Sequence, residues 1–336
     1  MPTYLGIEGG GTTWKVAIAQ DKPDNITESI RFDTTSPEET FGKIKEWIKD
    51  KNYDSVGIAT FGPVDPKLTS PTYGHITTTP KPGWKNVDVV GALTDGSKPI
   101  LFDTDVNAPA LAEFTFHASS PTQSSVAYIT VGTGVGVGLV INGKTVHGLV
   151  HPEGGHVPPF RLPSDGIKGN DLYKDIEGLS NTIAIASKKG IDRHLLKTIG
   201  DDDAVWDSVA HALGSLCATL VLMVSVERIV ISGGVLNRTI LYPKIRAKTL
   251  EILKGYIVHP LLTPALIDQY ITPSEWGDNA GIVGALTLAK VALDDKGKNS
   301  VLGKARAYVC KHGAAVFLGV VLGAAATAVG VFGKRK

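Results

Sequence analysis

The same order of segments occurs twice in this chain of 336 residues: an apolar segment, a loop of glycine and threonine, and a second apolar segment. Residues 3–19 have this order around Gly-Gly-Gly-Thr, and residues 126–141 have it around Gly-Thr-Gly. Short apolar segments on both sides of a tight loop predict a β-hairpin. The repeat therefore predicts two related domains that face each other across a cleft.

Strand-like and helical segments alternate along the rest of the chain, which predicts an α/β fold. We expect a small N-terminal α/β domain at residues 1–115, completed by residues 280–293, and a large α/β domain at residues 116–279. The strands expected outside the two hairpins are residues 55–59, 99–102 and 228–231. The helices expected are residues 37–48, 177–189, 204–226 and 279–292, with a further helix starting near residue 237.

Asp105 lies where the apolar segment 99–102 ends and a helix is expected to begin. In sequence it stands between the two glycine loops. Phosphoryl transfer to a hydroxyl needs such an acid, because it can orient the attacking oxygen and accept its proton. The structural alternative is that Asp105 caps the helix, although Asn107 could do that instead. We predict that Asp105 is the catalytic base.

The glycine loops are predicted to hold the phosphates of ATP. Glycine lets the backbone come close to a phosphate oxygen, where a Cβ atom would interfere. The alternative is that both loops are ordinary hairpin turns. The residues predicted to bind phosphate are Gly9, Gly10, Gly11, Thr12, Thr130, Gly132, Thr133 and Gly134.

The charge of the chain is balanced, with 34 Lys and Arg against 33 Asp and Glu. No basic stripe is present, so we expect no nucleic-acid partner. The two cysteines form neither a disulfide framework nor a Cys-rich metal motif.

Residues 313–333 are uncharged and rich in Gly, Ala and Val, with Lys311 before them and basic residues after them. About 20 residues at ~1.5 Å each cross the ~30 Å core of a bilayer. We therefore expect a transmembrane tail anchor at 313–333 after a linker at 294–312, with the catalytic part in the cytoplasm at an intracellular membrane. The alternative is a buried Ala/Gly helix. Gly319 and Gly323 could allow a homodimer.

The chain resembles the ROK-type sugar kinases of the actin/Hsp70/hexokinase superfamily over about residues 3–292. The motifs that carry the resemblance occur in the family order, at residues 7–12, 62–65, 104–107, 132–134, 151–156 and 233–235. Residues 72–74 and 79–84 are similar more specifically to the bacterial-type ROK fructokinases. The resemblance implies two ribonuclease-H-like (actin-like ATPase) domains around a cleft.

The resemblance also implies roles for individual residues. Gly233 and Gly234 would lie against the adenosine of ATP. Glu8 would face Mg²⁺, through water, because Mg²⁺ keeps several of its waters. The residues implied to bind the sugar are Gly62, Pro63, Thr104, Asp105, Asn107, Glu153, His156 and Glu177.

The sequence departs from the family at two places. The family usually has a lysine directly after the Thr12 position, whereas this chain has Thr13 there and Lys15 two positions further along the same strand face. In the fructokinases the counterpart of His156 looks like a zinc ligand, together with a Cys-x-x-His-x-x-Cys segment. Here residues 169–175 contain no Cys or His. One imidazole and one carboxylate cannot close a tetrahedral site, so zinc is not expected.

The first hypothesis is an ATP-dependent hexose phosphotransferase, specifically a fructokinase that phosphorylates the 6-hydroxyl of D-fructose with Mg²⁺ as cofactor. One alternative is a ROK kinase for another hexose such as glucose or mannose. The other is a non-catalytic, membrane-tethered sensor or scaffold that binds sugar or nucleotide.

Overall fold

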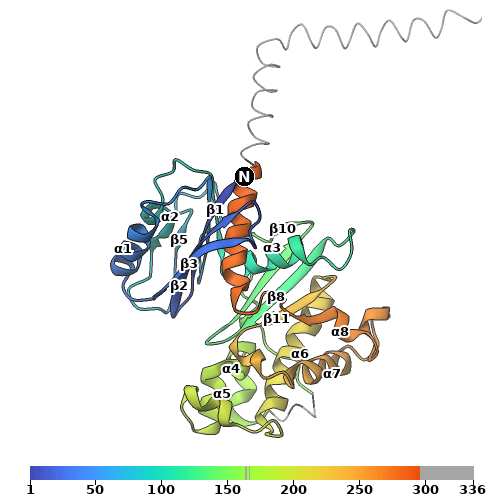
Figure 1. Cartoon of the computed structure of the whole chain (residues 1–336). Helices are drawn as coiled ribbons and strands as arrows, with labels where there is room; N and C mark the ends of the chain where they lie inside the picture. Colours follow the sequence, from blue (N-terminus) through green and yellow to red (C-terminus); the bar gives the residue numbers. More distant parts are fainter. Residues whose placement is uncertain (163–164, 166, 296–336) are drawn as a thin grey trace, which may run out of the picture.

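The computed structural model describes residues 1–162, 165 and 167–295 (Figure 1). Its first half is built on a five-stranded sheet in the order β3-β2-β1-β4-β7. β1, β2 and β3 form an antiparallel meander, while β4 and β7 run parallel to β1. The strands are β1 (Thr3–Gly9), β2 (Thr13–Gln20), β3 (Ile26–Asp33), β4 (Ser55–Thr60) and β7 (Ile100–Thr104).

The second half repeats this topology in the order β10-β9-β8-β11-β12. Again an antiparallel meander is followed by two strands parallel to the first one. The strands are β8 (Ser125–Val131), β9 (Val135–Ile141), β10 (Lys144–Thr145), β11 (Ile229–Ser232) and β12 (Ile271–Pro273). Two mixed sheets of the same topology confirm the α/β class, and they agree with the actin-like architecture that the resemblance implies. Asn142 and Gly143 both have positive φ, as a two-residue hairpin turn requires.

A layer of helices lies between the two sheets. It consists of α3 (Asn107–Phe116) and the helix at 280–295, which is the long orange helix beside β1 in Figure 1. Glycines allow close packing here. A Cβ atom on Gly57 of β4 would lie 1.9 Å from the Ala285 carbonyl oxygen, and one on Gly138 of β9 would lie 2.0 Å from the Val106 carbonyl oxygen. α3 packs mainly on β8 and β9, although the predicted boundary at residue 115 places it in the first domain.

The outer face of the first sheet carries its own aromatic core. Trp84 is fully buried and stacks on Trp14, with ring centroids 5.4 Å apart, while Phe41 and Phe61 pack against Trp84 edge-on. Phe41 comes from α1 (Pro37–Ile48), which has the predicted bounds, and the Ser36 hydroxyl caps this helix by accepting from the Glu39 amide. The remaining elements on this side are β5 (His75–Ile76), β6 (Val87–Asp88) and α2 (Val89–Leu93).

The outer face of the second sheet is covered by helices around α6 (Val205–Met223), a core helix of the second domain. Among the described residues, α6 alone is long and apolar enough to cross a membrane, and most of it is buried inside the protein. The other helices are α4 (Ile176–Ser180), α5 (Thr182–Lys189), α7 (Leu241–Leu253) and α8 (Ile267–Tyr270). The short 3₁₀ helices are η1 (Gly154–His156), η2 (Gly169–Tyr173), η3 (Arg193–Thr198), η4 (Gly234–Asn237), η5 (Pro260–Leu262) and η6 (Gly277–Asn279).

Two predicted helices differ from the observed ones. The helix expected at 177–189 is split into α4 and α5, because the Asn181 side chain accepts from the Ala184 amide and starts a new helix. The helix expected near residue 237 begins only at Leu241, after the 3₁₀ turn η4.

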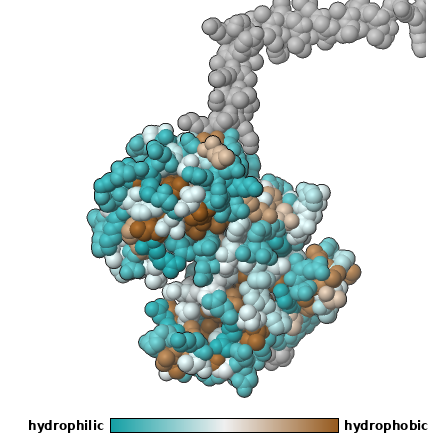
Figure 2. Space-filling view, in the orientation of Figure 1, coloured by the Kyte–Doolittle hydropathy of each residue, from teal (hydrophilic) through white to brown (hydrophobic). Residues whose placement is uncertain are grey.

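The predicted linker at 294–312 and the predicted transmembrane segment at 313–333 lie almost entirely outside the described residues. Residues 294–295 of the predicted linker are the last residues of the helix at 280–295. The rest of the linker and the predicted transmembrane segment 313–333 lie outside the described residues. On the side shown in Figure 2 the described surface is largely hydrophilic and is hollowed between the two lobes.

Candidate active site

The predicted site residues follow the carboxyl ends of parallel strands in both sheets. In the first sheet Gly9, Thr60 and Thr104 are aligned across the ends of β1, β4 and β7. In the second sheet Thr130 near the end of β8 is paired with Ser232 at the end of β11. Ligands of open α/β sheets bind in the crevice outside these strand ends. The topology therefore places the first glycine loop and Asp105 at the carboxyl edge of the first sheet, and the second glycine loop at the carboxyl edge of the second sheet.

The first glycine loop exposes two of its backbone amides. Gly10 closes the loop by donating to the Thr13 carbonyl (2.8 Å), and Thr34 donates to the carbonyls of Gly10 and Thr12. Gly11 and Thr12 are exposed, and within the described part of the chain their amides donate to no protein acceptor. Successive N–H groups left open in a turn form an anion-binding nest.

The glycines of this loop differ in how much space a Cβ atom would have. Gly9 is buried, and a Cβ atom there would lie 2.6 Å from the Thr60 hydroxyl oxygen and from the Trp14 ring. Packing against Thr60 and Trp14 is therefore one reason for glycine at this position. A Cβ atom on Gly11 would meet no protein atom within 4 Å, so this position is open to a ligand.

The second glycine loop is braced by Glu177. The Gly132 amide donates to the Gly134 carbonyl, and Glu177 Oε2 accepts from the Val135 amide, both at 2.8 Å. A Cβ atom on Gly134 would lie 2.8 Å from the same Glu177 oxygen. Thr133 is exposed at the tip of the loop. One oxygen of Glu177 is therefore engaged with the predicted phosphate loop rather than available to a sugar.

Gly233 joins the second loop to a cavity of about 480 Å³ at the ends of β11 and β12. Its φ of 101° is in the region that favours glycine, and a Cβ atom would lie 2.5 Å from the Val131 carbonyl oxygen. Gly234 begins η4 and is not among the residues that line this cavity. The lining combines apolar and polar groups, including Leu236, Asn237, Tyr242, Pro243 and Arg246.

Asp105 lies directly after β7, and its amide donates to the Thr60 carbonyl at the end of β4 (3.0 Å). Its side chain is partly buried. Burial, with the negative charges of Glu8 and Glu153 nearby, raises the pKa of Asp105 to about 7. A carboxyl with a pKa near neutral pH is suited to general acid–base chemistry.

Glu8 is the neighbouring acid at the end of β1. Burial raises the pKa of Glu8, although Lys15 and Arg31 act in the opposite direction. Its Oε1 faces Gly281, where a Cβ atom would lie 2.0 Å away. Its Oε2 is buried, has no hydrogen-bond partner in the described structure and lies 4.0 Å from the Lys15 ammonium. This oxygen is a suitable acceptor for a water or a hydrated cation.

His151 connects the two halves of the site. Its Nε2 accepts from the Val64 amide (3.0 Å), and its Cε1 and Nε2 lie next to Gly62, which precedes the cis-proline Pro63. On its other side, His151 Nδ1 lies 3.6 Å from Glu153 Oε1. His151 therefore holds the 62–64 turn of the first half against the loop that carries Glu153.

His156 is exposed, and its Nδ1 lies 2.9 Å from Asp175 Oδ2. This contact raises the pKa of His156. Asp175 also caps α4 by accepting from the Gly178 amide. Within the described residues no group of three or more His, Cys, Asp or Glu side chains could hold a metal ion.

Two residues predicted to bind the sugar have side chains that are engaged within the protein. Thr104 is 2 % exposed, and its hydroxyl accepts from the Asn107 amide at the start of α3, so neither Asp105 nor Asn107 caps this helix. Asn107 is fully buried, donating from Nδ2 to Asp103 and accepting at Oδ1 from the Leu139 amide. Both side chains are occupied in holding α3 between β7 and β9.

Asp103 and His147 extend this buried network and were not singled out by sequence reasoning. Asp103 Oδ2 lies 2.8 Å from His147 Nε2, and Asp103 raises the pKa of His147 although burial alone lowers it. His151 was also missed as a site residue. The motif at 151–156 contains it, but only the position of Val64 in the fold reveals its partner.

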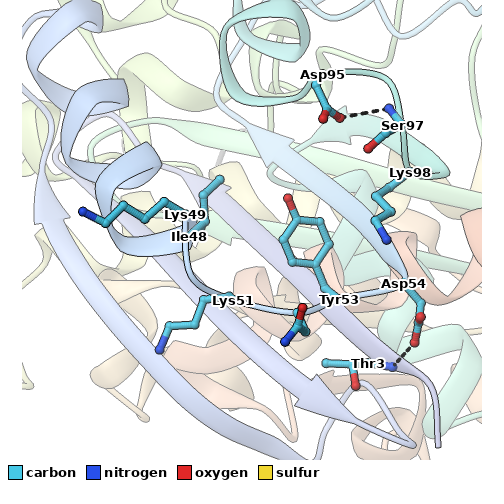
Figure 3. Close-up of a pocket in the computed structure, with 10 residues that line it drawn as sticks. Thr3, Ile48, Lys49, Lys51, Tyr53, Asp54, Asp95, Ser97 and Lys98 are labelled. Atoms are coloured by element: carbon cyan, nitrogen blue, oxygen red, sulfur yellow. Dashed lines mark hydrogen bonds between the residues drawn. The ribbon is translucent and has the colours of Figure 1, made fainter.

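A second cavity of about 390 Å³ lies away from this site (Figure 3). Thr3 at the start of β1, Asp54 before β4 and Lys98 before β7 place it at the amino ends of the strands. The Asp54 carboxylate accepts from the Thr3 amide, and the Asp95 carboxylate accepts from the Ser97 amide. This cavity is therefore not part of the candidate site.

Two sheets of one topology, each with a glycine loop at its carboxyl edge, define the actin-like class of α/β folds. The chain belongs to the ROK family, whose model matches residues 4–292. It is 36 % identical over 290 residues to the fructokinase of Pediococcus pentosaceus, covering 85 % of this chain and 97 % of that protein. It is 38 % identical over 299 residues to the fructokinase of Zymomonas mobilis, covering 86 % and 97 %.

A solved structure supports the same fold. The ROK family glucokinase from Streptomyces griseus, in complex with glucose and AMPPNP, matches with a TM-score of 0.67. The match covers 86 % of this chain and 99 % of that chain, at 21 % sequence identity. At 21 % identity this similarity shows the fold alone.

Proposed function

We propose that this chain is an ATP-dependent fructokinase, which converts ATP and D-fructose to ADP and D-fructose 6-phosphate. The observation that carries the proposal is the position of Asp105, directly after β7 with its amide on the Thr60 carbonyl and close enough to Glu8 and Glu153 for their charges to raise its pKa. Fructose is favoured because relatives called fructokinases are 36–38 % identical over nearly their whole length, whereas the glucokinase of known structure is 21 % identical.

In this reaction Asp105 accepts the proton of the fructose 6-hydroxyl. The hydroxyl oxygen forms a bond to the γ-phosphorus of ATP, and the bond from that phosphorus to the ADP oxygen breaks. The raised pKa of Asp105 makes the carboxylate a stronger base than an ordinary aspartate while leaving it largely ionised above neutral pH.

The nucleotide would lie across both domains. The open amides of Gly11 and Thr12 and the second loop at 132–134 would hold its phosphates, because backbone N–H groups bind anions without a side chain. Its adenosine would occupy the cavity beside Gly233, where Tyr242 and Leu236 offer apolar surface to a base.

The sugar would lie between Asp105 and the loop that carries Glu153. Glu153 is exposed, and its charge contributes to the raised pKa of Asp105, so the two carboxyl groups are near enough to share one ligand. His151 keeps the cis-Pro63 turn beside this space. Carboxylates accept hydrogen bonds from adjacent hydroxyl groups, as a sugar requires.

The residues present fit a Mg²⁺ ion. Among the described residues the buried Oε2 of Glu8 has no hydrogen-bond partner, and oxygen is the ligand that Mg²⁺ prefers. Glu8 would hold the ion through water, and the bound ion would neutralise charge on the phosphates of ATP.

The test is an ADP-release assay with D-fructose, D-glucose, D-mannose and N-acetylglucosamine, with Asp105→Asn as the control variant. We expect the highest kcat/KM with fructose, and fructose 6-phosphate as the product identified by NMR. Faster turnover of another hexose would assign the chain to a kinase for that sugar. Binding of sugar and nucleotide with no ADP release would favour the sensor instead.

We also propose that residues 313–333 anchor the chain in an intracellular membrane, with the described domains in the cytoplasm. The support is the uncharged composition of this segment and its basic flanks. The full chain is expected to sediment with membranes, and a chain ending at residue 304 is expected to stay in the supernatant. A full chain that stays in the supernatant without detergent would contradict the anchor.

A further inference from the structure

The segment at residues 79–84 is fixed beneath the first glycine loop. Its Trp84 is fully buried, stacks on Trp14 and donates from Nε1 to the Thr35 carbonyl (2.9 Å). Trp14 is paired with Gly9, the last residue before the loop. Trp84 therefore couples the position of the whole segment to the position of the loop.

From this anchored segment Lys81 reaches the loop itself. Its ammonium donates to the Gly11 carbonyl oxygen at 2.6 Å, beside the two amides that have no protein acceptor. An ammonium group has three N–H donors and no acceptor. With one donor directed to Gly11, two remain for an anion held by the same loop.

The negative charges near the first glycine loop favour a cation that offsets their repulsion of ATP. Glu8, Asp105 and Glu153 are close enough for the two glutamates to raise the pKa of Asp105, and all three carboxylates oppose an approaching triphosphate. Lys15 donates to the Asp278 carbonyl and lies 4.0 Å from Glu8, and the charge of Arg31 also acts on Glu8. Both of these cations therefore interact with the acid at the end of β1, whereas Lys81 contacts the loop itself.

We propose that Lys81 binds the terminal phosphates of ATP, using Gly11 as the support that holds its ammonium in place. This inference rests on the proposed function, because it assumes that the first glycine loop receives the phosphates. It assigns the cation of this loop to a residue about 70 positions further along the chain, brought there by the Trp84 anchor.

The test compares Lys81→Met and Lys81→Arg with Lys85→Met, which changes an exposed lysine directly after the 79–84 segment. Binding of the non-hydrolysable analogue β,γ-imido-ATP and of AMP, both with Mg²⁺ and without sugar, is measured by calorimetry. We expect Lys81→Met to weaken binding of the ATP analogue roughly ten- to a hundredfold, as loss of a hydrogen bond to a charged group does. Binding of AMP is expected to change less than about twofold, because AMP lacks the terminal phosphates.

The other variants and conditions separate charge from packing. Lys81→Arg should retain most of the affinity, Lys85→Met should match the wild type, and salt should weaken ATP-analogue binding less in Lys81→Met than in the wild type. Equal weakening of both nucleotides would show that Lys81 only supports the loop, and unchanged affinity for the ATP analogue would also overturn the assignment. A chain that binds the analogue in a Lys81-dependent way but phosphorylates no sugar would refute the proposed function and leave the Lys81 assignment intact.

Discussion

Replacing Asp105 by asparagine keeps the size of the side chain and removes the proton acceptor. Loss of a general base typically lowers the rate by ~10²–10⁴. We expect kcat of Asp105→Asn to fall by that range, while the dissociation constant for ATP changes little, because the nucleotide loops do not depend on this side chain. Single-turnover kinetics and calorimetry measure the two quantities, and a kcat close to the wild-type value would refute Asp105 as the base.

The pKa of Asp105 also predicts how activity depends on pH. Burial and the charges of Glu8 and Glu153 raise the pKa to about 7, so the carboxyl is protonated below that pH and cannot accept the hydroxyl proton. We expect kcat/KM for the sugar to rise with pH and to level off above about 7. The variant Glu153→Gln removes one of the charges that raise the pKa, so its profile is expected to shift to lower pH. A profile that falls between pH 6 and 8 would contradict the prediction.

A substitution at Asn107 tests whether this side chain stabilises the fold or binds the sugar. Its amide is fully buried and bonds to Asp103 and to the Leu139 backbone, rather than to the sugar space. Leaving buried partners unsatisfied costs about 1–3 kcal/mol, so Asn107→Ala should lower the free energy of unfolding by that amount. Urea denaturation measures it, with the exposed Asn237→Ala as a control. A large rise in KM for the sugar with unchanged stability would restore the predicted sugar contact.

At the scale of elements, the position of the 79–84 segment depends on the buried side chain of Trp84. Trp84 fills the aromatic core with Trp14, Phe41 and Phe61. Truncating a buried tryptophan to alanine costs about 3–5 kcal/mol, so Trp84→Ala should destabilise the protein by this amount in urea denaturation. Tyr173→Ala is the control, because Tyr173 is 91 % exposed. Similar stability of the two variants would show that the segment does not depend on this anchor.

The elements also show what sequence patterns could predict. The strands around the glycine loops were predicted because alternation and turn residues are local signals, and the end of α5 at Gly190 was predicted for the same reason. The contacts of Lys81 with Gly11, His151 with Val64 and Asp103 with His147 could not be predicted. Each pair is separated by more than 40 residues, so only the folded topology makes the partners neighbours.

At the scale of the whole molecule, the helix at 280–295 holds the two sheets together through close packing. A Cβ atom on Gly57 would lie 1.9 Å from the Ala285 carbonyl oxygen and 2.5 Å from the Ala289 nitrogen. Gly57→Ala therefore has to move this helix, and overpacking of a core typically costs about 1–3 kcal/mol. Gly42→Ala is the control: it lies in α1 with open space, and the change should stabilise the helix by about 0.5–1 kcal/mol. Thermal unfolding of both variants measures the difference, and equal melting temperatures would contradict close packing of the helix.

The position of that helix in the chain has a consequence for synthesis on the ribosome. The first sheet is complete once β7 has been made, but the helix that covers its inner face comes about 175 residues later. Until then, apolar side chains such as Tyr4 and Ala59 lack their final neighbours. Nascent chains that stop before residue 280 should therefore remain sensitive to protease and recruit chaperones, even when all strands of the first sheet have been made.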